Sequence, residues 1–210
     1  MAEIPETTAI PEAETDSLLA EYAADTCRRM AAGLLEHTGP ELRAFLAAET
    51  ALLQGALDDP ATLGPGEPND PPWFSRKGHV VLNTNPVTSH RNAIAPLLTE
   101  KYDGHRVIAT TGPLPLQYQG PRGRLHGGYV GVLLDQVLWS AVRLRHDNAG
   151  FTRTLSITYE RPTPLDEELT IEAWTTTVDG RKTFAEGELR CGKTVCARAE
   201  GLWVSPRTSR

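Results

Sequence analysis

The sequence is poor in cysteine and has neither an excess of basic residues nor an uninterrupted apolar segment long enough to span a membrane. Its 210 residues include three cysteines, an odd number without the regular spacing of a disulfide framework. Lys and Arg number 21 against 27 Asp and Glu, and the net charge of -6 argues against a protein that binds the phosphate backbone of nucleic acids. We therefore expect a reduced, cytoplasmic protein without a nucleic-acid partner.

The longest apolar segment contains Asp135 and is followed closely by Arg143 and Arg145, so no membrane span is predicted. The N-terminus is acidic and lacks the basic region that precedes the apolar part of a secretory signal. The histidines His79, His90, His105 and His146 do not have the paired spacing of metal ligands. We expect no metal site.

The composition changes along the chain and suggests four parts. Residues 1–16 are acidic and proline-bearing, which is typical of a disordered tail. Residues 17–58 show helical spacing of apolar residues interrupted by Gly39 and Pro40, which predicts a two-helix N-terminal extension. Residues 59–82 are rich in proline and glycine and are predicted to form a loop. Residues 83–205 are expected to form the main domain.

The main domain is predicted to contain one long helix followed by antiparallel strands. Apolar residues from Tyr129 to Leu144 fall on every side of a helical wheel, which predicts a helix that is buried all round. Residues rich in β-branched and aromatic types predict strands at 105–111, 154–160, 168–177, 183–190 and 194–204. This order indicates an α+β fold in which an antiparallel sheet wraps around one central helix, with an N-terminal helical extension.

One segment matches a phosphate-binding loop by its letters alone. Residues 187–194, GELRCGKT, fit the pattern G-x4-G-K-[ST]. A working phosphate loop joins a strand to a helix, whereas residues 195–204 are predicted to be a strand. We therefore interpret the segment as a β-hairpin.

The most informative motif is His126-Gly127-Gly128, followed by Asp135 within the predicted helix. Glycines at a helix start let backbone N–H groups approach a ligand, and the helix dipole favours a developing oxyanion there. A carboxylate inside an apolar helix must be hydrogen-bonded, have a raised pKa or face a wet cavity. We interpret the glycine turn as the polar half of an acyl-transfer site.

Asp135 follows Gly128 by seven residues, so both point to one side of the helix but lie about 10 Å apart along its axis. One scissile bond cannot touch both groups of the same helix. We therefore predict a two-fold homodimer, or a dimer of dimers, whose composite active sites use the glycines of one chain and the acid of the other.

The motif HGG-x6-D, the segments FTRTLSITYERPTPL and AEGLWV, and the hairpin VDGRK resemble the hotdog-fold acyl-CoA thioesterases of the PaaI type over Asn83 to Val204. The resemblance implies a hotdog fold and hydrolysis of an acyl-CoA to free acid and CoA, without a metal or redox cofactor. It also implies that Gly127, with Gly128 nearby, polarises the thioester carbonyl.

The same resemblance implies that Asp135 is the general base or nucleophile and that Thr152 positions the attacking water. His126 is expected to shape the loop and to bond the carbonyl or a neighbouring backbone group. Arg161, Arg181 and Lys182, at strand and hairpin ends, are candidates for binding the CoA phosphates.

The sequence departs from the family pattern at two positions. Many relatives carry an asparagine six residues before the histidine, where this chain has Gly120, with Gln117 and Gln119 as the nearby amides. Several relatives have a second acid where this chain has Gln136, so Asp135 is alone in its role.

Two other functions remain open from the sequence. A hotdog hydratase or dehydratase would use Asp135 and His126 together on an acyl thioester. A non-catalytic acyl-CoA binding or regulatory protein would retain the fold without turnover, because a shared fold does not fix a function.

Overall fold

The computed structural model describes residues 12–63, 85–145 and 150–207. The chain divides into two compact units, Met1–Ala95 and Pro96–Arg210. Most of the loop predicted at 59–82 lies outside the described residues, apart from the short 3-10 helix η1, Pro60–Leu63. No helix in the described ranges is both long and apolar enough to cross a membrane.

The first unit contains the helices α1, Glu12–Glu36, and α2, Gly39–Asp58. The first turn of α1 falls within residues 1–16, which the sequence predicts to be disordered. The helices fit closely because Gly33 leaves room for the ring of Phe45, which would lie 2.1 Å from a Cβ at that glycine. Arg29 of α1 also donates a hydrogen bond of 2.9 Å to Glu49 of α2.

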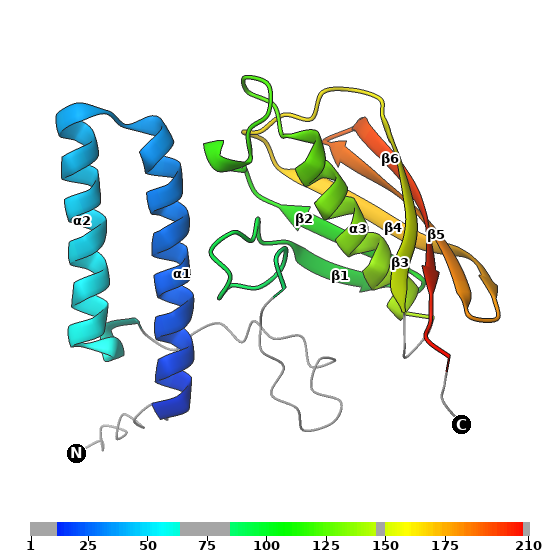
Figure 1. Ribbon diagram of the computed structural model, residues 1–210, viewed down its shortest axis with the longest axis horizontal. Coiled ribbons are helices and arrows are strands. Elements are labelled where there is room, and N and C mark those ends of the chain that lie inside the picture. The colour runs from blue at the N-terminus through cyan, green and yellow to red at the C-terminus, as the bar shows by residue number, and fades with distance from the viewer. Residues whose placement is uncertain (1–11, 64–84, 146–149, 208–210) are drawn as a thin grey trace, which may run out of the picture. The chain divides into compact units, whose positions relative to one another are not determined.

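The second unit is a six-stranded antiparallel sheet with the helix α3, Gly127–Arg143, packed on one face (Figure 1). The strand order is β1-β2-β4-β5-β6-β3. The strands are β1, Thr99–Asp103; β2, Arg106–Thr111; β3, Phe151–Tyr159; β4, Leu169–Asp179; β5, Lys182–Cys191; and β6, Thr194–Val204. This is the predicted α+β hotdog arrangement, and the five predicted strands are confirmed.

The core lies between α3 and the middle of the sheet. Leu133, Leu134, Val137 and Leu138 of α3 are fully buried. Leu138 packs against β5 at Gly187, where a Cβ would come within 2.7 Å of its Cδ1 atom. The glycine therefore lets the helix lie close to the sheet.

Two sequence predictions need correction. Strand β1 was missed because its sequence, TEKYD, is polar and it lies at an edge of the sheet, where its side chains are mostly exposed. The prediction that the helix is buried all round is wrong for the single chain, since Val132 of α3 is 39% exposed. Its own sheet covers only one side of the helix.

The hairpin interpretation of the phosphate-loop match is confirmed. Residues 187–191 belong to β5, Gly192 has a positive φ of 53°, and β6 begins at Thr194. The segment joins two strands, so it lacks the helix N-terminus that a phosphate loop requires.

Candidate active site

One side of α3 faces the edge strand β3. Gly127, Gly131 and Asp135 follow one another at intervals of four residues, so they line the same side of the helix. The two glycines let the strand come close. The hydroxyl of Tyr159 donates a hydrogen bond of 2.9 Å to the carbonyl oxygen of Gly127, and Ile157 Cδ1 lies 3.3 Å from the position of a Cβ on Gly131.

Asp135 is linked to the same strand by a side-chain hydrogen bond. Thr152 Oγ1 donates to Asp135 Oδ1 over 3.0 Å. The register between β3 and β6 shifts between Thr152 and Thr154, so Arg153 is the extra residue of a β-bulge. Because side chains alternate along a strand, the bulge turns Thr152 to the side that Ile157 uses. Without this bulge Thr152 would point away from the helix.

The carboxylate of Asp135 is half-buried in the single chain rather than fully buried. The structure provides a hydrogen bond to this carboxylate. One oxygen of the carboxylate accepts from Thr152. The predicted pair of Asp135 and Thr152 is therefore brought together by geometry that the sequence pattern did not show.

His126 caps the N-terminus of α3. Its Nδ1 atom accepts a hydrogen bond of 3.0 Å from the backbone N–H of Gly128, so that donor is occupied. The N–H of Gly127 has no hydrogen-bond partner among the described residues. The His126 carbonyl belongs to the same peptide group as the Gly127 N–H. It accepts hydrogen bonds from the N–H groups of Tyr129 and Val130 at 2.9 and 3.2 Å. The geometry thus leaves Gly127 as the available backbone donor.

The packing around Gly120 leaves no room for a side chain at this position. A Cβ on Gly120 would lie 2.9 Å from the Cα atom of His126, which is too close for any side chain without movement. Gln119 cannot replace the missing amide freely, because its Oε1 accepts from the N–H of Gly123 at 2.7 Å. The Oε1 atom of Gln117 is buried and has no partner within the described part of the chain.

A second polar cluster lies beside α3 and includes a residue that the sequence did not indicate. Ser140 Oγ donates to Glu100 Oε1, and Tyr102 OH donates to Glu100 Oε2, both over 2.8 Å. Gln136 Nε2 in turn donates to Ser140 Oγ at 3.4 Å. Burial raises the pKa of Glu100, an effect that these hydrogen bonds oppose. The cluster ties β1 to the helix, and it was missed because β1 itself was not predicted.

The basic residues predicted to bind CoA phosphates are exposed, but they lie in two separate groups at opposite ends of β3. Arg181 and Lys182 lie at the β4–β5 hairpin. This hairpin is near the start of β3, because Lys182 pairs with Val204 and Val204 pairs with Phe151. Arg161 follows the other end of β3. At about 3.3 Å per residue, the length of β3 separates the two groups by about 25 Å.

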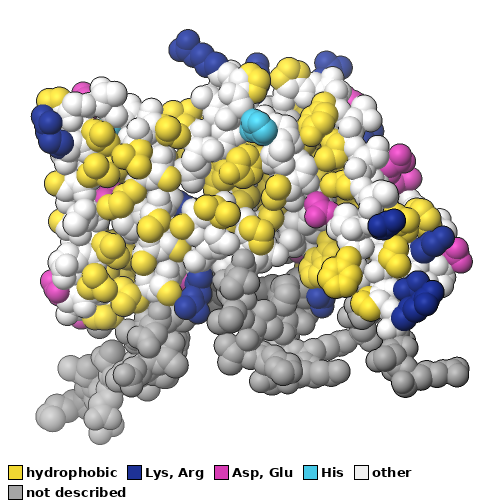
Figure 2. Space-filling view, viewed as in Figure 1, with side chains coloured by type: hydrophobic (Ala, Val, Ile, Leu, Met, Phe, Trp, Pro, Cys, Tyr) yellow, Lys and Arg dark blue, Asp and Glu magenta, His cyan; other side chains and the backbone are white. Residues whose placement is uncertain are grey.

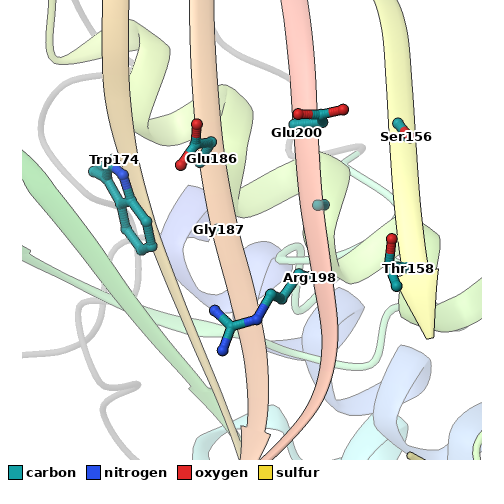
Figure 3. Close-up of a pocket in the computed structure, with 8 residues that line it drawn as sticks. Ser156, Thr158, Trp174, Glu186, Gly187, Arg198 and Glu200 are labelled. Atoms are coloured by element: carbon teal, nitrogen blue, oxygen red, sulfur yellow. The ribbon is translucent and has the colours of Figure 1, made fainter. Parts of the chain in front are cut away.

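A separate hollow of about 350 Å³ lies on the side of the sheet away from α3 (Figure 3). It is lined by Ser156, Thr158, Trp174, Glu186, Gly187, Arg198, Ala199 and Glu200. None of the predicted site residues contributes to it. Arg198 at its edge forms ion pairs with Glu160 and Glu188 that brace neighbouring strands.

The cysteines do not form a nucleophilic centre. All three are free, and Cys196 is buried. The Cys191 thiol donates to Glu167 at 3.0 Å, and this hydrogen bond is the main cause that raises the pKa of Cys191 to about 11. A raised pKa lowers the fraction of reactive thiolate.

Comparison with known proteins shows similarity to the thioesterase superfamily. The family model described as "Thioesterase superfamily" matches residues 122–197, which include the HGG motif, Asp135 and Thr152. A thioesterase superfamily protein of known crystal structure is 35% identical in sequence to this chain, and the two structures match with a TM-score of 0.65. The match covers 88% of this chain and 94% of the other protein's chain.

Two curated proteins match over shorter segments. The acyl-coenzyme A thioesterase THEM4 of Bos taurus is 33% identical over 88 residues, which are 41% of this chain and 35% of that protein. An uncharacterized protein of Schizosaccharomyces pombe is 33% identical over 93 residues, 41% of this chain and 53% of its own length. This chain therefore spans between about a third and about a half of each curated relative.

Proposed function

Because this chain belongs to the thioesterase superfamily, we propose that it hydrolyses an acyl-coenzyme A thioester to the free acid and coenzyme A. The observation that carries the proposal is the pairing of an acid and an available backbone donor on one side of α3. Asp135 is held by Thr152, and the N–H of Gly127 has no partner within the described residues. The similarity to a protein named an acyl-coenzyme A thioesterase supports the substrate class.

In the proposed reaction the N–H of Gly127 donates to the thioester oxygen and stabilises the oxyanion as it forms. Asp135 takes a proton from a water molecule, whose oxygen bonds to the carbonyl carbon. The tetrahedral intermediate then breaks its carbon–sulfur bond. The thiolate of coenzyme A leaves and receives the proton, so the acid and the thiol are the products. No metal or redox cofactor takes part in these steps.

Thr152 orients the base in this scheme. Its hydrogen bond occupies Oδ1 of Asp135 and leaves the other carboxylate oxygen for the water. His126 contributes by capping the helix start, where its Nδ1 holds the N–H of Gly128. Gly127 is thereby the main donor to the oxyanion, and Gly128 acts through the shape of the turn.

The proposed enzyme is a homodimer with composite sites, alone or as a dimer of dimers. Gly127 and Asp135 are eight residues apart, about 12 Å along the helix, so one carbonyl cannot contact both. Strand β3 is an edge of the sheet, and an edge is open to pairing with another chain. Phe151 at the start of β3 and Val132 of α3 are exposed, and Figure 2 shows apolar side chains on the face of this unit that carries α3.

Mixing two inactive variants tests the composite site. In a mixed dimer of Asp135→Asn and Gly127→Pro chains, one site has both defects and the other has neither. Random reassortment is then expected to restore about a quarter of the wild-type activity, since half of the dimers are mixed and one site works in each. A mixture that regains no activity after subunit exchange is demonstrated would contradict the composite site.

Coenzyme A brings phosphates, and we assign them to the basic residues at the ends of β3. Arg161 lies at one end, and Arg181 with Lys182 at the other. In a two-fold dimer, the arginines of one chain can bind the phosphates of a coenzyme A whose thioester lies at Asp135 of the partner chain. Substituting each group separately and measuring KM for the same acyl-CoA identifies which end binds the nucleotide.

Hydrolysis is preferred to the hydratase alternative because His126 Nδ1 is engaged in the helix cap. Thiol release from short, medium, long and aryl acyl-CoAs tests the proposal directly. Hydration of crotonyl-CoA without thiol release would support the hydratase instead. Tight binding of acyl-CoA without turnover of any compound would support a non-catalytic binding protein.

A further inference from the structure

Tyr159 is the last residue of β3, and its hydroxyl forms a hydrogen bond with the first residue of α3. The side chain is 54% exposed, yet its hydroxyl donates to the carbonyl of Gly127 at 2.9 Å. The ring also lies against this glycine, with Cε1 and the hydroxyl each 3.5 Å from the position of a Cβ on Gly127. Tyr159 was not among the residues that the sequence indicated for the site.

The hydrogen bond fixes one peptide group of the glycine turn from both sides. The carbonyl of Gly127 accepts from Tyr159, and the N–H of Gly128, in the same peptide group, donates to His126. Two consecutive glycines have more backbone freedom than any other pair. A peptide group that is held at both its carbonyl and its N–H cannot rotate, so the preceding N–H, that of Gly127, keeps its direction.

The end of β3 is itself firmly attached to the sheet. The backbone N–H groups of Glu160 and Arg161 both donate to the carbonyl of Cys196, at 2.9 and 3.0 Å. Arg198 of β6 also donates to Glu160 over 2.8 Å. Tyr159 therefore reaches Gly127 from a fixed point rather than from a free strand end.

We propose that Tyr159 is a positioning residue of the oxyanion site, acting through the carbonyl of Gly127. Strand β3 then sets both chemical groups of its own chain, because Thr152 holds Asp135 and Tyr159 holds the glycine turn. The inference rests on the proposed thioester hydrolysis. It adds that the strand at the sheet edge controls transition-state stabilisation as well as the orientation of the base.

The test is Tyr159→Phe, which keeps the ring and removes the hydroxyl. The expected result is a fall in kcat of about tenfold, on the scale of one lost hydrogen bond, with KM unchanged. The shape of the pH–rate profile is expected to stay the same because Asp135 and Thr152 are untouched. Amide exchange at Gly128 is expected to become faster, which reports the freed peptide directly.

Tyr129→Phe is the matched control. Tyr129 lies in the first turn of the same helix, packs edge-on against Tyr118, and makes no hydrogen bond through its hydroxyl within the described ranges. We expect wild-type kcat and wild-type amide exchange from it. Equal losses of rate in both variants would indicate general damage to the turn and would contradict a specific role for Tyr159.

A Tyr159→Phe enzyme with wild-type kcat would overturn the inference while leaving the proposed function intact. If the wild type turns over no acyl-CoA, the proposed function fails, and amide exchange then decides the inference by itself. In that case faster amide exchange at Gly128 in Tyr159→Phe would support the positioning role, and unchanged exchange would contradict it.

Discussion

Thr152 donates a hydrogen bond of 3.0 Å to Asp135, joining the edge strand of the sheet to the only acid of the central helix. The contact exists because a β-bulge at Arg153 reverses the direction of the Thr152 side chain. An acid held by one oxygen keeps a defined orientation. The relationship therefore links a local irregularity of the strand to the proposed chemistry.

Thr152→Val removes the donor while it keeps the β-branched shape. The expected result is a fall in kcat of about 10- to 100-fold, because a hydrogen bond to a charged group is lost. Thr152→Ser retains the hydroxyl and is expected to remain close to wild type. Rates of thiol release for the three proteins check this, and a Val variant as active as the Ser variant would contradict an orienting role.

Gly127→Pro removes the backbone N–H of Gly127. Proline is well accommodated at the first position of a helix, and His126 before it has the extended conformation that proline requires, with a ψ of 133°. Gly127→Pro is expected to lower kcat by about 100-fold or more.

Gly127→Ala is the matched control for this experiment. It keeps the N–H, and its Cβ would make only ordinary contacts of 3.5 Å with Tyr159. We expect it to retain most of the activity. Similar losses in the Pro and Ala variants would show that the space at this position, rather than the N–H, is what matters.

Gly120→Ala is expected to lower both stability and activity. The added Cβ would lie 2.9 Å from His126 Cα, so the start of the HGG turn must move. We expect the free energy of unfolding to fall by about 1–3 kcal/mol. Gly112→Ala provides the comparison, since a Cβ there would meet nothing within 4 Å. Urea unfolding of both variants checks the prediction, and equal stability would contradict the close packing at Gly120.

Glu100 predicts a pH dependence of stability. Burial raises its pKa above the ordinary value of 4.5, so the folded protein holds this proton at a pH where the unfolded chain has released it. The contribution of Glu100 to the stability of the folded protein is therefore complete below about pH 4.5. It is lost as the pH rises through the pKa that Glu100 has in the folded protein. Glu100→Gln should become more stable relative to wild type over this rise. Unfolding free energies measured from pH 4 to pH 8 check the sign, and a constant difference would contradict it.

The sequence predicted the central helix and five of the six strands, because their apolar residues recur with helical or strand spacing. It also predicted His126, Gly127 and Asp135 as site residues. The first two are neighbours in the sequence, and Gly127 and Asp135 lie on one helix. Strand β1 escaped prediction because an exposed edge strand needs no apolar alternation.

The contacts across the site could not be predicted in the same way. The link from Thr152 to Asp135 depends on a bulge, and the link from Tyr159 to Gly127 depends on where β3 crosses the helix. Both are set by strand register, which one sequence does not reveal. The exclusion of a side chain at Gly120 likewise depends on the path of the loop that returns to His126.

The most direct measurement compares thiol release by wild type and by Asp135→Asn on the same acyl-CoA, with Asp179→Asn at the β4–β5 hairpin as a control for loss of one surface acid. We predict that Asp135→Asn loses about 100-fold or more in kcat and remains folded, because a general base has been removed. Asp179→Asn is expected to keep the wild-type rate. Equal rates for wild type and a folded Asp135→Asn protein would contradict the account and make Asp135 a structural residue.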